Sequence, residues 1–225
     1  MSPRIALSGK KIWTILTGNL IGYLFYWIIS YLSLFLSKYN LFSSINKFGL
    51  YPHIFNSETS YISILVYSLG LIIWIAFISI SFTAVSRITL EELNGNHLFS
   101  ISDAWIFSLK HWQTIIFTPL TIIFIISTLL IITALLTLMH SIPYIGSIIF
   151  NSLFPIFFIG SVFIIYTALV LINSLIYSSA IIASYEEDIM GTIFQSYSIT
   201  WSQPWRVITY NFIILILTII GLVFY

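Results

Sequence analysis

The chain contains no cysteine, and only 7% of its 225 residues are charged. The missing thiols exclude disulfide bonds, thiolate nucleophiles, iron–sulfur clusters and covalently attached haem. An ordinary soluble domain carries about 25% charged residues. Residues 111–185 contain no Asp, Glu, Lys or Arg, and no water-soluble fold could cover its surface from such a stretch. The low charge therefore indicates a protein whose solvent is the lipid bilayer.

The balance of charges excludes one class of partner. Eight basic and seven acidic residues give a formal net charge of +1, which leaves no electrostatic footprint for a polyanion. Nucleic-acid binding needs a clustered basic face, so we expect no nucleic acid. The expected partners are membrane lipid and other membrane protein subunits.

Long apolar runs predict five membrane-spanning helices, each close to or above the roughly 20 residues that cross a hydrocarbon core. They cover residues 12–36, 61–85, 114–139, 155–184 and 207–225. Pro143 suits the first turn of a helix and Pro155 breaks one, so residues 143–153 are predicted to form a separate short interfacial or re-entrant helix. The predicted fold class is all-α, a polytopic transmembrane helical bundle with amphipathic interfacial helices.

The basic residues between the spans predict the orientation of the chain. Six of them fall on the side of the N-terminus, and two, Lys38 and Lys47, fall on the other side. Because cytoplasmic loops carry an excess of Lys and Arg, the N-terminus and the loops around Glu91 and Glu186 are expected in the cytoplasm. The expected location is the inner membrane of a bacterial cell; a mitochondrially encoded subunit is the alternative.

A recurring pattern divides the chain into three predicted repeats, about residues 8–86, 87–185 and 186–225. Each has a tryptophan at the start of a span and a polar residue six positions later: Trp13 with Asn19, Trp112 with Thr118, and Trp205 with Asn211. The third repeat holds only the first half of a helical hairpin. The pattern therefore predicts that a sixth span is missing after Tyr225, with a five-span protein as the alternative.

The second and third repeats open with stretches predicted to be amphipathic helices on the membrane surface, because apolar residues recur at helical spacing. These residues are Ile101, Ala104, Trp105, Leu109 and Trp112 in one stretch and Ile189, Met190, Ile193, Phe194, Tyr197 and Trp201 in the other. Predicted interfacial anchors are Trp13, Trp105, Trp112, Trp201, Trp205 and Arg206. Acidic residues before each stretch form a candidate docking or polar cluster, or simply suit a helix N-terminus: Glu91, Glu92, Glu186, Glu187 and Asp188.

The predicted spans contain no charged residue, which argues against a proton relay, ion-coupled transport or voltage sensing. Their small and polar residues are predicted to pack helix against helix: Gly18, Asn19, Gly22, Asn173 and Asn211. The sequence has no catalytic motif, and its four histidines follow no metal-binding spacing. We therefore predict no catalytic residue, no metal site and no cofactor.

One segment has a familiar order of features. Small residues and paired acids end a span from Ala180 to Glu187, and a glycine, an amphipathic stretch with Trp201 and then Trp205-Arg206 follow. With the Ile-Pro-Tyr-Ile-Gly turn at residues 142–146, this order resembles a broad family of bacterial polytopic proteins. That family includes the membrane domain attached to glycerophosphodiester phosphodiesterases. The resemblance covers about residues 80–225 and implies a six-span inner-membrane bundle of mostly unassigned function, without the soluble catalytic barrel.

These patterns favour a non-catalytic scaffold or accessory subunit of a membrane complex. The alternative is a transporter or lipid-handling protein with a pathway between pseudo-symmetric repeats, near Asn19, Thr118, Asn173 and Asn211. An enzyme that acts on membrane lipid through Glu187 is a third hypothesis. Gentle extraction with its co-purifying chains, or flux through liposomes, separates these functions.

Overall fold

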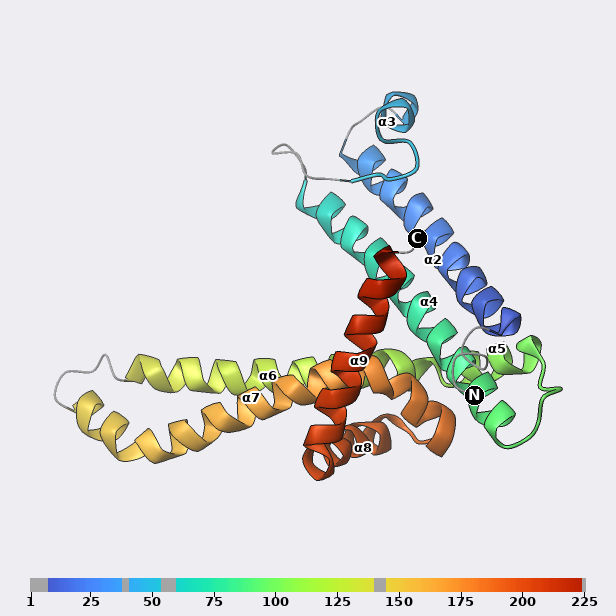
Figure 1. Ribbon diagram of the computed structural model, residues 1–225. Coiled ribbons are helices and arrows are strands. Elements are labelled where there is room, and N and C mark those ends of the chain that lie inside the picture. The colour runs from blue at the N-terminus through green and yellow to red at the C-terminus, as the bar shows by residue number, and fades with distance from the viewer. Residues whose placement is uncertain (1–7, 38–40, 54–59, 140–144, 224–225) are drawn as a thin grey trace. The chain divides into compact units, whose positions relative to one another are not determined.

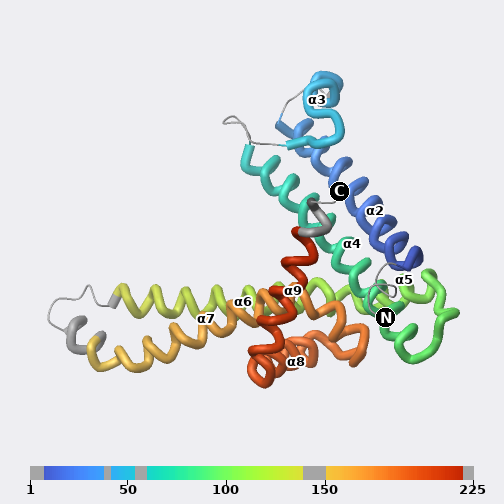
Figure 2. Tube along the Cα trace, in the orientation of Figure 1, coloured from blue at the N-terminus to red at the C-terminus, as the bar shows by residue number. Residues whose placement is uncertain are grey.

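A computed structural model describes residues 8–37, 41–53, 60–139 and 145–223 (Figures 1 and 2). Within these ranges the chain forms eight helices and no strand, so the all-α prediction is confirmed. The helices are α2 (Gly9–Leu36), α3 (Leu41–Phe48), α4 (Tyr61–Leu93), α5 (Ile101–Lys110), α6 (Trp112–Met139), α7 (Ile145–Tyr185), α8 (Ile189–Ser202) and α9 (Pro204–Val223). They belong to two compact units, residues 1–115 and 116–225. The three predicted repeats stay a prediction.

Four helices are long and apolar enough to cross a membrane: Gly9–Leu36, Tyr61–Leu93, Trp112–Leu138 and Asn151–Tyr185. A shorter apolar helix, Pro204–Ile219, corresponds to the fifth predicted span. Large apolar side chains on these helices are exposed, such as Phe124 at 69% and Leu217 at 61%. Such a surface is compatible with hydrocarbon and not with water.

The predicted break at Pro155 is wrong. Helix α7 runs without interruption from Ile145 to Tyr185, with Pro155 inside it. Proline removes one backbone hydrogen bond and crowds the preceding turn, which breaks helices in water. Spanning helices tolerate proline because neighbouring groups and local adjustments satisfy the freed carbonyl. Residues 145–153 therefore belong to α7, and Pro143 lies outside the described residues.

Small residues hold α2 and α4 together in the N-terminal unit, where the two helices lie side by side (Figure 1). A Cβ added to Gly18 would lie 2.4 Å from the Ser81 Cβ, and one added to Gly22 would lie 2.9 Å from the Phe77 Cβ. Asn19 Oδ1 accepts a 2.8 Å hydrogen bond from Trp74 Nε1 across the same interface. Without a hydrophobic driving force in lipid, close approach of this kind is how helices associate.

Tyrosine hydroxyls attach α3 and the segment after it to α2. Tyr31 donates to the Gly49 carbonyl at 2.6 Å, Tyr26 donates to the Pro52 carbonyl at 2.7 Å, and Tyr23 donates to the Leu50 carbonyl. These phenols have an apolar body and a polar tip, which suits the boundary between lipid and water.

Most hydroxyls on the long helices bond to their own helix rather than across the unit. Thr83 donates to the Ser79 carbonyl at 3.1 Å, Thr121 to the Phe117 carbonyl at 2.7 Å, and Thr133 to the Leu129 carbonyl at 2.8 Å. Each bond satisfies a hydroxyl that would otherwise lack a partner in an apolar surrounding. These side chains consequently offer little to a solute passing along the helices.

The short helices α5 and α8 pack through small side chains. Ser100 caps α5 by accepting a 3.1 Å bond from the Asp103 amide, and Ala104 and Ser108 on its inner face are buried. Ala104 packs against Ala84 and Ile88 of α4. The N-cap satisfies a backbone donor that the first turn leaves free.

Helix α8 buries a row of hydroxyl residues spaced four apart: Thr192, Ser196 and Thr200. The predicted apolar face is divided. Its Ile189, Ile193 and Tyr197 pack in a cluster with Val170 of α7 and Ile122 of α6. The remaining large side chains are exposed: Met190 at 58%, Phe194 at 70% and Trp201 at 77%. In lipid, small residues favour helix contacts and large apolar ones face outward.

Candidate functional site

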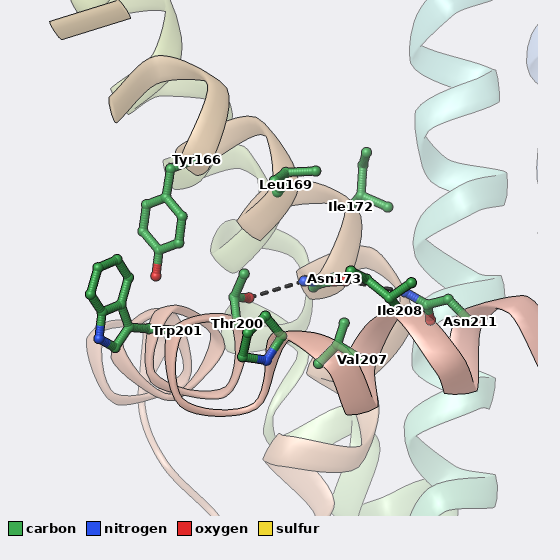
Figure 3. A pocket seen from close by; sticks show the side chains of 10 residues that line it. Tyr166, Leu169, Ile172, Asn173, Thr200, Trp201, Val207, Ile208 and Asn211 are labelled. Atoms are coloured by element: carbon green, nitrogen blue, oxygen red, sulfur yellow. Dashed lines mark hydrogen bonds between the residues drawn. The ribbon is translucent and has the colours of Figure 1, made fainter. Parts of the chain in front are cut away.

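A cavity of about 490 Å³ lies between α7, α8 and α9 of the C-terminal unit (Figure 3). Helix α7 contributes Tyr166, Leu169, Ile172 and Asn173; α8 contributes Thr200 and Trp201; and Pro204, Val207, Ile208 and Asn211 come from α9. Pockets for small molecules have volumes of about 300–1,000 Å³ and combine apolar walls with a few convergent polar groups. This cavity has that composition.

Two amides form the polar part of the cavity. Asn173 is 7% exposed, and its Nδ2 donates to Thr200 Oγ1 at 3.0 Å. Asn211 Nδ2 donates to Asn173 Oδ1 at 3.3 Å, and the Tyr177 hydroxyl donates to Asn211 Oδ1 at 2.7 Å. Thr200 in turn donates to the Ser196 carbonyl at 2.8 Å. The network therefore joins all three helices.

Helix α8 reaches the cavity because it packs against residues 166–173 of α7. The Tyr166 hydroxyl donates to the Tyr197 carbonyl at 2.9 Å, and the Tyr197 hydroxyl donates to Thr167 Oγ1 at 3.2 Å. The Trp201 ring stands edge-on to the Tyr166 ring with 5.8 Å between centroids. These contacts place Thr200 and Trp201 over the apolar stretch of α7, well before its end at Tyr185.

A second hollow of about 320 Å³ meets the cavity at Tyr166 and Trp201. Its other lining residues are all apolar and belong to α7: Phe158, Ile159, Val162 and Phe163. From Phe158 to Asn173 the helix rises roughly 22 Å. An apolar trough therefore follows α7 away from the amides.

The lining residues of both hollows include no Asp, Glu, Lys, Arg or His. Arg206 lines a neighbouring hollow, formed by Ser202–Arg206, that shares Pro204 with the cavity, and its Nη1 donates to Gln203 Oε1 at 3.2 Å. The lining also has no nucleophile paired with a base. The arrangement can bind an uncharged molecule through its amides, and its Tyr166 and Thr200 hydroxyls donate to backbone carbonyls of α8.

Charged residues of the N-terminal unit gather at one end of α2 and α4. Lys11 Nζ lies 2.8 Å from Glu92 Oε2, with the side chains only 3% and 15% exposed. Arg87 lies 3.2 Å from Glu91 one turn later and stands over the Phe107 ring at 4.5 Å. The acidic pair that the sequence offered for docking is therefore engaged with the chain's own cations.

The second acidic group forms the turn between α7 and α8. Asp188 caps α8 by accepting a 2.9 Å bond from the Gly191 amide. Glu186 has a positive φ of 54°, and the Glu187 side chain lies against Gly191. Among the three acidic residues, Asp188 therefore performs the helix-capping role that the sequence suggested.

The predicted tryptophan anchors differ in their exposure. Trp13, Trp112, Trp201 and Trp205 are exposed. Trp105 is half-buried, and its Cη2 would lie 3.1 Å from a Cβ on Gly18. This ring therefore packs at the close approach of α2 and α4, whereas the other four rings can reach lipid.

Within the C-terminal unit, two residues of the predicted pathway lie together. Asn173 and Asn211 share the cavity, whereas Asn19 bonds to Trp74 in the N-terminal unit. Thr118 is fully buried on α6, and its hydroxyl has no hydrogen-bond partner among the described residues. His53, His97 and His111 join no group of three metal-binding side chains in the part of the chain that the structure describes, and His140 lies outside it.

Sequence reasoning did not identify Tyr166, Tyr177 and Thr200 as members of the site. A signal for Thr200 was present, because Thr192, Ser196 and Thr200 recur every four residues on one helical face. The two tyrosines carried no such signal, since tyrosine is also common at membrane boundaries.

Comparison of the chain with models of known families, with curated proteins and with solved structures found no match. The resemblance to the membrane domain of glycerophosphodiester phosphodiesterases therefore stays a prediction. The long apolar helices define the class: the chain is a multi-pass integral membrane protein.

Proposed function

We propose that this chain is a lipid-handling protein of a bacterial cytoplasmic membrane, with its N-terminus in the cytoplasm, and that its C-terminal unit binds one membrane amphiphile. The observation that carries the proposal is the cavity between α7, α8 and α9, with Asn173 and Asn211 on one side and apolar walls elsewhere. In a bilayer, such a cavity is accessible to lipids and not to charged solutes.

The proposed binding of a lipid also agrees with the chemistry of the remaining polar groups. Hydroxyls on the long helices bond to their own backbone, as Thr121 and Thr133 do. A hydrophilic solute would find no continuous row of free donors along them. A lipid needs polar contacts only at its head, which is what the two amides supply.

The experiment compares lipids that co-purify with three forms of the full chain in mild detergent. Leu169→Trp fills the cavity with a larger ring, whereas Ile165→Trp places the same ring one turn earlier on α7, at an exposed residue that lines neither hollow. We expect one amphiphile per chain in the parent and in Ile165→Trp, and its loss in Leu169→Trp, by mass spectrometry of extracted lipid. Equal lipid in all three forms would refute the proposal.

A scaffold or accessory subunit is the second candidate, and the exposed apolar side of α8 favours it. Met190, Phe194 and Trp201 are 58%, 70% and 77% exposed, and they form a surface that a second membrane protein could cover. Sizing and mass spectrometry after gentle extraction tests this candidate. A defined partner in fixed ratio, lost with Phe194→Ser, would support the scaffold; a chain that extracts alone would remove it.

A further inference from the structure

The cavity also indicates what kind of head the bound amphiphile carries. Resting on the proposed lipid-handling function, we propose that the site selects a single-chain amphiphile with a small uncharged head that both donates and accepts hydrogen bonds, such as a long-chain alcohol, primary amide or monoacylglycerol. The head lies at Asn173 and Asn211, and the chain follows α7 toward Phe158.

The hydrogen-bonding capacity of the two amides supports a head with both kinds of group. A carboxamide has two N–H donors and an oxygen that accepts two bonds. Asn173 and Asn211 each use one donor and one acceptor position within the network. One N–H and one acceptor position on each amide are left over, and Asn173 is 7% exposed. Leaving such groups unmatched in an apolar surrounding is costly.

The absence of charge in the lining argues against an ionic head. None of the ten residues that line the larger cavity is Asp, Glu, Lys, Arg or His. A phosphate or carboxylate would lose its hydration without gaining a cation, and a quaternary ammonium would find no carboxylate. A neutral head avoids this desolvation penalty.

The shape of the site supports one chain rather than two. The apolar trough bounded by Phe158 and Phe163 is a single hollow of about 320 Å³, and it meets the larger cavity only at Tyr166 and Trp201. A chain that starts at Asn173, crosses the larger cavity and follows the trough to Phe158 would run beside α7 for roughly 22 Å. A single apolar trough of this width suits one acyl chain.

The test uses the full chain in nanodiscs with a diazirine-bearing hexadecanol as photo-crosslinking probe. Hexadecanol, hexadecanamide, ionised hexadecanoate and hexadecyl phosphate compete with the probe, and labelled peptides are read by mass spectrometry. We expect labelling of α7 between Phe158 and Asn173, with the neutral competitors effective at about tenfold lower concentration than the ionic ones, because an ionic head loses its hydration without gaining a countercharge.

Two variants of Asn211 test whether the amides set this selectivity. Asn211→Leu should weaken hexadecanol competition about tenfold. Thr209→Val, at an exposed hydroxyl of α9 outside the lining, should leave it unchanged. Asn211→Asp introduces a carboxylate of similar shape and should admit hexadecylammonium, which the parent rejects.

The outcomes separate this inference from the function on which it rests. Equal or better competition by hexadecanoate or hexadecyl phosphate overturns the neutral-head inference, while labelling in the trough still supports lipid handling. Labelling that avoids α7 altogether, together with unchanged co-purifying lipid in Leu169→Trp, overturns both. Unchanged selectivity in Asn211→Leu and Asn211→Asp removes the amides from the head site.

Discussion

Gly18→Ala should loosen the packing of α2 on α4, because the new methyl group has no room. Its Cβ would lie 2.4 Å from the Ser81 Cβ and 2.8 Å from Ser81 Oγ. Non-bonded carbons prefer about 3.5–4.0 Å, so the helices would have to separate locally by roughly 1 Å. Overpacking of this kind costs about 1–3 kcal/mol, while alanine gains about 1 kcal/mol over glycine in a helix.

The net cost is up to about 2 kcal/mol, and relative to a glycine-to-alanine control without the clash it is about 1–3 kcal/mol, which is large enough to measure by heating. For a chain of this size 1 kcal/mol corresponds to about 2–4 °C in Tm. The assay is fluorescence-detected size-exclusion chromatography of the detergent-extracted chain after heating. We expect Gly18→Ala to lower the temperature at which the monodisperse peak is lost by about 2–4 °C for each kcal/mol of lost stability. Gly160→Ala is the control, since a Cβ there meets nothing within 4 Å.

Rescue by a second substitution makes the reasoning specific. Ser81→Gly removes the two nearest atoms that the Gly18 methyl would meet and leaves Trp105 Cη2 at 3.1 Å, so Gly18→Ala/Ser81→Gly should recover most of the lost stability. A double variant as unstable as Gly18→Ala would show that the cost comes from elsewhere. A single variant as stable as Gly160→Ala would refute the close approach itself.

Three further substitutions test other contacts of the two units. Lys11→Met leaves the Glu92 carboxylate without its buried partner and should lower stability by roughly 3 kcal/mol. The double variant Lys11→Met/Glu92→Gln should be closer to the parent in stability. Equal losses in the single and double variants would argue against the ion pair. Ser100→Ala removes the cap of α5 and should cost about 1 kcal/mol, measured by the same heating assay, and no change would contradict a capping role. Thr200→Val removes the acceptor for Asn173 and should lower stability by about 0.6 kcal/mol, the typical contribution of an interhelical hydrogen bond in a membrane. A loss above about 2 kcal/mol would mean that the whole network, and not this one bond, contributes the stability.

The spans could be predicted from the sequence because hydropathy follows directly from the bilayer as solvent. A run such as residues 61–85 has one stable state in hydrocarbon, a helix with its backbone bonds satisfied internally. The same reasoning failed at Pro155, because proline rules learned from soluble helices overstate its cost inside a membrane. The length of α7 was therefore not predicted.

The sequence predicted some polar residues of the site but not how they are arranged. Asn173 and Asn211 stood out as polar residues in apolar runs, but their 3.3 Å contact depends on how α7 and α9 pack, which periodicity does not encode. The burial pattern of α8 could not be predicted for a related reason. Met190, Ile193 and Phe194 recur at helical spacing on one stretch, and of these three only Ile193 is buried. In lipid, size rather than polarity decides which side chains meet another helix.

The length of α7 relates the cavity to the thickness of the membrane around it. Its apolar part, Asn151–Tyr185, has 35 residues, about 52 Å of helix at 1.5 Å per residue, against a hydrocarbon core of about 30 Å. Observed tilts of spanning helices reach about 40°. At that tilt the apolar part would still extend about 40 Å along the membrane normal. Hydrophobic mismatch must therefore act on this helix. Because α8 packs on α7 at residues 166–173, a change in its tilt carries Trp201 and the cavity with it, and we expect amphiphile occupancy to change with the acyl-chain length of the surrounding lipids.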